Sequence, residues 1–421
     1  MTSSERPGPT RRSAKPPLED DELRERTASQ IEIVRQGLGP DNVRWDSGDS
    51  EDPSDFDYLY RSDALLVRDE DLDRVAAVVP GEVRDSLVGG VTLFAPTEDE
   101  PLAALNRIDS DLGRGVATPD HVVYVAPRGT LCPATEPEEP DGDLVVPKPA
   151  AADSSDGRDV LVAVVDTGWL PEAAENPATP WLKGVTGDEE TYDDANIREY
   201  VGHGTFVAGI VKCLAPAASV RVEGFLPHGG AVFESELIKQ MTEALRDAPD
   251  IISVSAGTTT RNNQELLAFQ VFYEQRLSRL KGTVLLAAAG NDGGRGPFWP
   301  AAFPWAVSVG ALDADGERAA WSNFGSWVDV YAPGVDLVNA YATGTYVATE
   351  PPDVGDERHF QGLARWSGTS FSTPVVSGLI AARMSNTGEN ARQAADALMA
   401  LARQHSKPGV GARLTPGMMM L

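Results

Sequence analysis

Residues 160–168 read VLVAVVDTG, an uninterrupted apolar run that ends in an acid, a threonine and a glycine. A strand that is apolar at every position is buried on both faces, which is typical of a parallel sheet covered by helices. Further apolar runs of this kind follow along the chain: VRVEGF (221–226), IISVS (251–255), VLLAAAG (284–290) and AVSVGA (306–311). Because ligands of such sheets bind at the carboxyl ends of the strands, chemistry is expected near Asp166.

Amphipathic stretches separate these runs and supply the crossovers that parallel strands require. Helices are predicted over 203–214, 235–247, 264–280 and 370–384. The alternation predicts an α/β domain over 158–404, with a parallel sheet and helices on both of its faces, followed by a C-terminal tail over 405–421.

The chain before this domain has a different pattern. Residues 1–27 are polar and charged at both signs, and they are predicted to form a disordered tail. Residues 28–127 are predicted to form a small α+β domain. Its expected strands and helices alternate, with strands at 64–67, 91–96 and 121–127 and helices at 69–79 and 101–108. Residues 128–157 are rich in Pro, Asp, Glu, Ser and Gly, which predicts an acidic linker.

Composition excludes several classes of protein. The 421 residues carry a formal net charge of −28, which disfavours a nucleic-acid or anionic-membrane partner because phosphate recognition requires a basic face. No apolar run of about 18 residues is present that could span a bilayer. Arg11 and Arg12 are not followed by an apolar signal region, so a cytoplasmic location is expected. Cys132 and Cys213 allow at most one disulfide and are expected to be reduced.

Three motifs put reactive side chains at the ends of predicted elements. Asp166 follows the first strand, His203 opens a helix in GHGTFVAG (202–209), and Ser370 opens another in SGTSFSTP (367–374). A serine hydroxyl needs a neighbouring base to attack at neutral pH, and a buried carboxylate fixes the tautomer of an imidazole that acts as this base. Asn291, just beyond a strand end, adds a side-chain amide that can bind a developing oxyanion.

The order Asp, His, Ser resembles that of the subtilisin-like serine proteases, or subtilases, over about residues 158–404. WSNFG (321–325) and VYAPG (330–334) are further matches. The resemblance implies a serine endopeptidase that works through an acyl-enzyme. Asp166 would be the orienting acid, His203 the general base and acid, Ser370 the nucleophile and Asn291 the oxyanion donor, with the backbone N–H of Ser370 as a second donor.

The resemblance also implies how a polypeptide substrate binds. Ser255, Ala256 and Gly257 would form a backbone edge that pairs with an extended peptide. Ala288, Ala289 and Gly290 would line the first specificity pocket. Phe206 stands where the family usually has a second histidine, and Phe371 replaces a commoner residue after the nucleophile, so the pocket is expected to differ in shape.

Two other classes of function compete with this interpretation. A catalytically silent, subtilase-like module would bind peptides without turnover. An esterase or lipase on an α/β-hydrolase scaffold would need a G-x-S-x-G elbow, whereas Ser370 lies in GTSFS. No organic cofactor or catalytic metal is expected. The acidic stretch 187–199 is interpreted as a solvated face rather than a calcium site, and His121, His228, His359 and His405 as surface or loop residues.

Two segments have open roles at this stage. The resemblance implies that the domain over 28–127 is an intramolecular inhibitor, with its linker in the catalytic cleft. The alternative is a targeting or sensing module that delivers the protease to one intracellular partner. The Gly- and Pro-rich insertion over 341–365 is either a lid or an ordinary surface loop.

Overall fold

The computed structural model describes residues 20–48, 56–87, 89–125, 134–142, 144–226 and 229–420. Its larger part is built on a seven-stranded, wholly parallel sheet with the order β13–β12–β11–β10–β6–β8–β7. The strands are β6 (Leu161–Asp166), β7 (Val185–Gly187), β8 (Ser219–Gly224), β10 (Ile251–Val254), β11 (Val284–Ala288), β12 (Val307–Leu312) and β13 (Val330–Pro333). The predicted α/β fold class is thereby confirmed.

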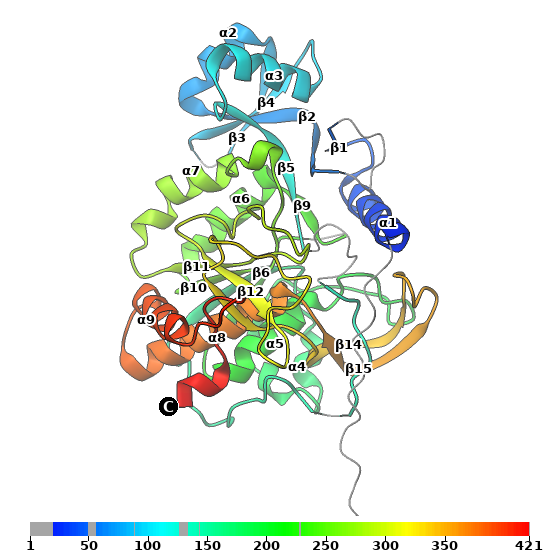
Figure 1. The fold of residues 1–421 in the computed structure, drawn as a ribbon, viewed down its shortest axis with the longest axis vertical. Helices are drawn as coiled ribbons and strands as arrows, with labels where there is room; N and C mark the ends of the chain where they lie inside the picture. The colour runs from blue at the N-terminus through cyan, green and yellow to red at the C-terminus, as the bar shows by residue number, and fades with distance from the viewer. Residues whose placement is uncertain are drawn as a thin grey trace, which may run out of the picture.

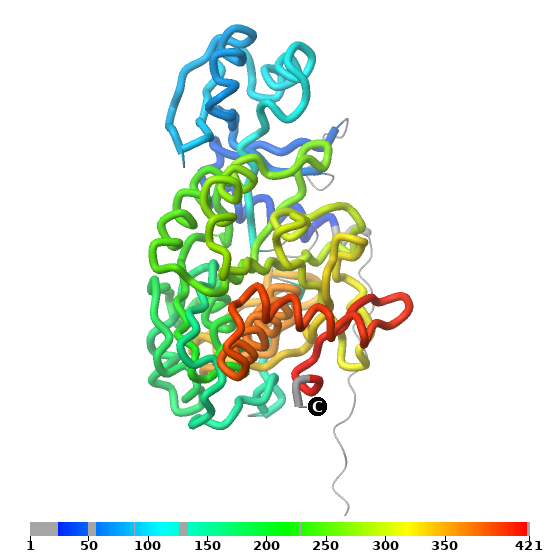
Figure 2. The backbone as a smooth tube through the Cα atoms, turned by 90° about the vertical axis from the view of Figure 1, so that its left-hand side faces the viewer, coloured from blue at the N-terminus to red at the C-terminus, as the bar shows by residue number. Residues whose placement is uncertain are grey.

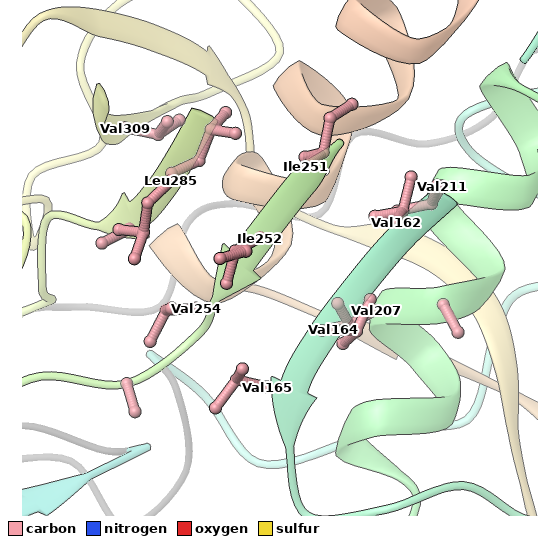
Figure 3. Packing of buried hydrophobic residues seen from close by; sticks show 14 of the residues in the cluster. Val162, Val164, Val165, Val207, Val211, Ile251, Ile252, Val254, Leu285 and Val309 are labelled. Carbon is pink, nitrogen blue, oxygen red and sulfur yellow. The ribbon is translucent and has the colours of Figure 1, made fainter. Parts of the chain in front are cut away.

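Helices cover this sheet and complete its core. They are α4 (Pro171–Glu175), α5 (His203–Leu214), α6 (Glu234–Ala244), α7 (Leu267–Gln275), α8 (Thr369–Thr387) and α9 (Ala391–Gln404). Helices α5 and α8 contact each other and the central strands. Figure 3 shows Val162 and Val164 of β6 beside Val211 and Val207 of α5. These valines are fully buried, which explains why β6 has no polar residue before Asp166.

The N-terminal part forms a second, antiparallel sheet at one end of the molecule (Figures 1 and 2). Its elements are α1 (Asp20–Leu38), β1 (Val43–Asp46), β2 (Tyr58–Arg68), α2 (Leu72–Val78), β3 (Gly81–Ser86), β4 (Val91–Pro96), α3 (Pro101–Leu112) and β5 (Ala117–Tyr124). Helices α2 and α3 cover one face of this sheet and enclose a small core of their own. The predicted α+β character is present, with β3 as a strand that the sequence pattern did not indicate.

The two parts share a sheet and a core. Strand β9 (Ala231–Phe233) follows β8 in the larger, C-terminal domain, yet it pairs antiparallel with β5 and becomes the edge strand of the N-terminal sheet. The other face of that sheet packs on α6 and α7. Its buried Leu66, Val91 and Val123 belong to the same apolar cluster as the strands of the parallel sheet.

The structure differs from the sequence predictions at several places. Helix α1 begins at Asp20, so the predicted disorder is wrong for residues 20–27; residues 1–19 lie outside the described residues. Apolar Ile31 and Val34 of this helix pack against β1 and β9 and stabilise it. The predicted helix over 264–280 is shorter, because only Leu267–Gln275 is α-helical before a 3-10 turn.

The insertion over 341–365 is neither a lid nor a loop, since most of it forms the antiparallel hairpin of β14 (Leu337–Val347) and β15 (Glu357–Trp366). Its aromatic residues Tyr341, Tyr346 and Phe360 are buried and hold the hairpin against the domain. The predicted tail is also packed, because Arg413 pairs with Tyr331 and Leu414 is buried.

Two remaining predictions concern histidines and membranes. His121 is buried in β5, so its expected surface position is wrong; His359 is exposed, and His228 lies outside the described residues. Helices long and apolar enough to cross a bilayer are absent from the part of the chain that the structure describes.

Candidate active site

Asp166 and His203 meet at the carboxyl edge of the parallel sheet. His203 Nδ1 lies 2.6 Å from Asp166 Oδ1, and both side chains are fully buried. The same carboxylate oxygen accepts a hydrogen bond from Thr167 N at 2.8 Å. Helix α5 approaches the end of β6 this closely because Gly204 has no side chain; a Cβ there would lie 2.1 Å from Gly168 O. The contact fixes the imidazole with Nε2 pointing away from Asp166.

Glu190 fixes the turn that leads into His203. Its Oε2 accepts a hydrogen bond from Gly202 N at 2.8 Å, and Gly202 has the left-handed backbone (φ 76°) that caps helix α5. Burial raises the pKa of Glu190 to about 8, and the nearby charge of Asp166 acts in the same direction. At neutral pH Glu190 is therefore mainly protonated and adds little negative charge beside Asp166. Sequence reasoning missed this residue, because it lies in the acidic stretch interpreted as a solvated face.

Ser370 lies at the start of helix α8, which begins at Thr369. Its Oγ is 3.4 Å from Ser255 O, and Ser255 Oγ donates to Ser370 O at 3.2 Å. Among the described residues, His203 Nε2 has no hydrogen-bond partner. The serine and imidazole are nonetheless neighbours, since the ring of the next residue, Phe371, has its centroid 5.1 Å from that of His203.

Asn291 is held beside Ser370 by Thr369, the residue that precedes this serine. Thr369 donates to Asn291 Oδ1 from its backbone N at 2.9 Å and from its hydroxyl at 2.8 Å. Gly290 N in turn donates to Thr369 Oγ1 at 3.1 Å. Since the carbonyl end of the amide is fixed, the direction of its N–H end is fixed too. The arrangement suits an oxyanion donor, which has to be oriented before charge develops.

The predicted substrate edge is occupied by the chain's own N-terminal domain. Tyr124, the last residue of β5, pairs antiparallel with Gly257: Tyr124 N donates to Gly257 O at 3.1 Å, and Gly257 N to Tyr124 O at 3.0 Å. The next residue, Val125, donates from its N to Gly230 O at 2.8 Å. Residues 124–125 thus lie extended between two backbone segments of the catalytic domain. Ser255 and Ala256, which precede Gly257, are buried.

The predicted pocket wall follows strand β11. Ala288 ends the strand, and Ala289 and Gly290 continue beyond it; all three are buried. The ring of Phe298 lies against this wall and against the substrate edge, because a Cβ on Gly290 or on Gly257 would meet it at 3.0 and 2.3 Å. No short motif marks Phe298, so sequence reasoning missed it.

Aromatic rings surround the imidazole of His203. The centroid of Phe371 lies 4.5 Å from that of Phe206, so the two residues that depart from the usual family pattern contact each other. Trp366 packs edge-on to His203 with a centroid distance of 5.5 Å. Such an apolar wall lowers the local dielectric and strengthens the hydrogen bond to Asp166. Trp366 lies outside the motifs that the sequence analysis singled out.

The described residues contain no group of three or more His, Cys, Asp or Glu side chains that could hold a metal ion, and this includes the described stretch 187–199. Cys213 is free and buried on α5, whereas Cys132 lies outside the described residues.

A parallel α/β sheet that brings a buried Asp–His pair to one edge, next to a serine at a helix start, has the equipment of a serine hydrolase. Comparison with known proteins specifies the class. The profile of the subtilase family matches residues 157–413, and the chain belongs to this family of serine peptidases.

Individual relatives agree with this family. Thermitase of Thermoactinomyces vulgaris is 30% identical over 260 residues, which cover 59% of this chain and 83% of thermitase. Subtilisin E of Bacillus subtilis (strain 168) is 30% identical over 238 residues, or 53% of this chain and 55% of subtilisin E. The solved structure of the protease domain of PatA, an S218A mutant, shares the fold. The matched region covers 64% of this chain and 96% of the PatA domain, with 23% sequence identity and a TM-score of 0.50.

Proposed function

We propose that this serine peptidase cleaves polypeptides through an acyl-enzyme formed on Ser370. The observation that carries the proposal is the buried 2.6 Å contact between His203 and Asp166, with Ser370 one residue away from a ring that packs on that imidazole. His203 Nε2 would take the hydroxyl proton while Ser370 Oγ attacks the carbonyl carbon of the scissile bond. Asp166 would hold Nδ1–H and stabilise the imidazolium that forms.

The oxyanion would be bound by the side-chain N–H of Asn291 and by the backbone N–H of Ser370 at the N-terminus of helix α8. Collapse of the tetrahedral intermediate expels the amine, which receives the proton from His203. Water then attacks the acyl-enzyme, with His203 as base, and releases Ser370. Ser255, Ala256 and Gly257 would align the substrate, and Ala288, Ala289 and Gly290 would bound the pocket for the residue before the scissile bond.

The competing proposal is a catalytically silent module that binds peptides. The reactivity of Ser370 distinguishes it from a peptidase. A fluorophosphonate probe reacts only with an activated serine. The expected result is labelling and peptide turnover by the full chain and neither by Ser370→Ala. Peptide binding without labelling of the full chain would favour the silent module.

For the N-terminal domain we propose an intramolecular inhibitor. The pairing of Tyr124 with Gly257 supports this role, because a strand seated on the substrate edge excludes a substrate from it. The alternative is a targeting module. In a time course on a gel, the inhibitor role requires release of an N-terminal fragment from the full chain and none from Ser370→Ala. A chain that is active while it stays intact would favour targeting. The cytoplasmic location stays a prediction.

A further inference from the structure

The chain returns to the catalytic centre on its other side. Residues 124–125 lie on the substrate edge, and after residues 126–133, which lie outside the description, Ala134 N donates to Ser367 O at 3.0 Å. Ser367 precedes the nucleophile by three residues. The segment continues antiparallel to the end of β15, since Glu138 and Arg365 exchange backbone hydrogen bonds of 2.9 and 2.8 Å. Trp366 Nε1 donates to Thr135 O at 2.6 Å.

Glu136 of this segment enters a buried socket in the β14–β15 hairpin. Its Oε1 accepts hydrogen bonds from Tyr346 Oη (2.8 Å), Thr349 N (2.7 Å), Thr349 Oγ1 (3.0 Å) and Glu350 N (3.2 Å). Its Oε2 is 3.7 Å from Arg358 Nη1. With 4% of the Glu136 side chain exposed, these donors replace nearly all the water that a carboxylate would otherwise bind. Because the socket consists of hydrogen-bond donors and a guanidinium, it is suited to bind a carboxylate side chain.

The carboxylates that follow meet further donors on the same hairpin. Arg365 pairs with Glu138 and, at 3.2 Å, with Asp141. His359 N donates to Glu139 Oε1 at 2.5 Å. Arg358 Nη1 also donates to Pro137 O at 2.8 Å. The segment 134–141 is therefore held by its backbone and by each of its acids.

Helix α1 contacts the turn that contributes the backbone donors to Glu136. Arg26 forms an ion pair of 3.2 Å with Glu350, and its guanidinium also donates to Pro351 O. Both residues belong to the turn whose backbone N–H groups receive Glu136. The donors of the socket are thereby fixed in place before any acid enters, which lowers the cost of binding.

We propose that this hairpin surface, formed by Tyr346, Thr349, Glu350, Arg358 and Arg365, is a recognition site for acidic residues on the carboxyl side of the scissile bond in polypeptide substrates. The proposal rests on the proposed function. The chain's own residues 134–141 are the first occupant, and the same backbone and carboxylate contacts are available to a substrate that displaces them.

Two matched peptides test the proposal with the full chain. One spans residues 120–145 of this sequence; the other has Gln or Asn in place of Glu136, Glu138, Glu139 and Asp141. The expected kcat/KM is about tenfold or more higher for the acidic peptide, and the ratio falls as salt rises. In Arg365→Gln the ratio is expected to drop towards one. Arg246→Gln, which removes an exposed arginine that pairs only with nearby Glu243 among the described residues, leaves the ratio unchanged.

Equal kcat/KM for the two peptides would overturn the recognition site while the peptidase function stands. If neither peptide is cleaved, labelling of Ser370 by the fluorophosphonate probe separates the two causes. No labelling means that the proposed function fails, whereas labelling without cleavage means that the N-terminal domain still occupies the substrate edge. Binding decides the recognition site separately. For this measurement, fluorescence anisotropy compares labelled acidic and neutral peptides of residues 134–145 on the Ser370→Ala chain. Tighter binding of the acidic peptide supports the site. Binding should become tighter still when Glu138→Gln, Glu139→Gln and Asp141→Asn are introduced in the chain, because they weaken the competing contacts of its own segment. Equal binding of the two peptides overturns the site. This result does not depend on Arg365→Gln, so it holds even if that variant fails to fold.

Discussion

The parallel sheet and the interface with the N-terminal domain are both buried, but they are stabilised by different groups. The strands β6, β10 and β11 are almost wholly apolar, and their first reactive group is Asp166, at the end of a strand. The interface instead buries ionisable residues: Asp120 with Arg61, Asp109 with Arg261, and His121 with Glu234. An apolar core is insensitive to pH, whereas buried charges and imidazoles make the attachment of a domain adjustable.

The largest expected effect is a loss of activity on substitution at the edge of the parallel sheet. Ser370→Ala should lower kcat by about 10⁵ to 10⁶, because the nucleophile, base and orienting acid act as a unit. Its combination with His203→Ala should add almost nothing. Active-site titration and single-turnover kinetics measure the loss, and urea unfolding should show little change in stability. Multiplicative losses in the double variant would contradict a shared mechanism.

The interface should respond in stability rather than in chemistry. Asp120 is fully buried and accepts hydrogen bonds from Arg61 Nε (2.7 Å), Ser235 N (2.9 Å) and Ser235 Oγ (2.7 Å). Asp120→Asn removes the charge and weakens the hydrogen bonds to Arg61 and Ser235, while Glu236 still pairs with Arg61 at 2.7 Å. The loss of the buried charge-assisted hydrogen bonds should cost about 1.5 to 3 kcal/mol. Urea unfolding of the Ser370→Ala chain, which avoids self-cleavage, measures this cost.

A matched ion pair in the same domain provides the control. Arg84 and Asp63 lie 3.4 Å apart with about half of each side chain exposed (54% and 53%). Asp63→Asn should change the free energy of unfolding by about 0 to 1 kcal/mol. Equal effects of the two substitutions would remove the distinction between a buried, charged interface and the exposed surface.

Substitution of Asn291 tests whether its side chain acts in the chemical step or in substrate binding. Asn291→Ala should lower kcat by about 10² to 10³ and leave KM almost unchanged, because the oxyanion exists only after attack. Steady-state kinetics with one peptide measure both constants. A rise in KM equal to the fall in kcat would show that the amide binds the substrate instead. Loss of stability would point to its bonds with Thr369.

The sequence predicted the parallel sheet because its strands are buried on both faces and therefore read as continuous apolar runs. Asp166, His203 and Ser370 were predicted as site residues because each lies at an element end inside a short motif. Local patterns of this kind do not report on partners far apart in the chain. Phe298 and Trp366 reach the site only through the tertiary fold, and neither has a motif.

The N-terminal domain was predicted less completely for the same reason. Strand β5 owes its full burial to β9 and α6, which are contributed by residues more than a hundred positions later. A histidine in a short strand is ordinarily a surface residue, so His121 was placed wrongly. Glu136 and its neighbours looked like a solvated linker, because their donors lie on a hairpin over two hundred residues away.

The last expected effect is a dependence of stability on pH at His121. Burial, together with the positive charge of Arg261, lowers the pKa of His121 to about 3. Arg261 N donates to its Nε2 at 3.2 Å, and its Nδ1 faces Glu234 Oε2 at 3.7 Å. Burial raises the pKa of Glu234 well above its usual value. Because a pKa of about 3 leaves His121 neutral at neutral pH, the contact between the two side chains is not an ion pair there.

Because the folded-state pKa of His121 is below its value of about 6.5 in the unfolded chain, the unfolded chain takes up a proton first. The contribution to stability is complete above pH 6.5 and falls by at most about 1.4 kcal/mol per unit as the pH drops towards 3. Urea unfolding of Ser370→Ala at a series of pH values measures this slope. His121→Gln, which keeps an acceptor for Arg261 N, should flatten the slope over this range, while His359→Gln at an exposed site should leave it unchanged. An unchanged slope in His121→Gln would assign the acid sensitivity of the interface to its carboxylates.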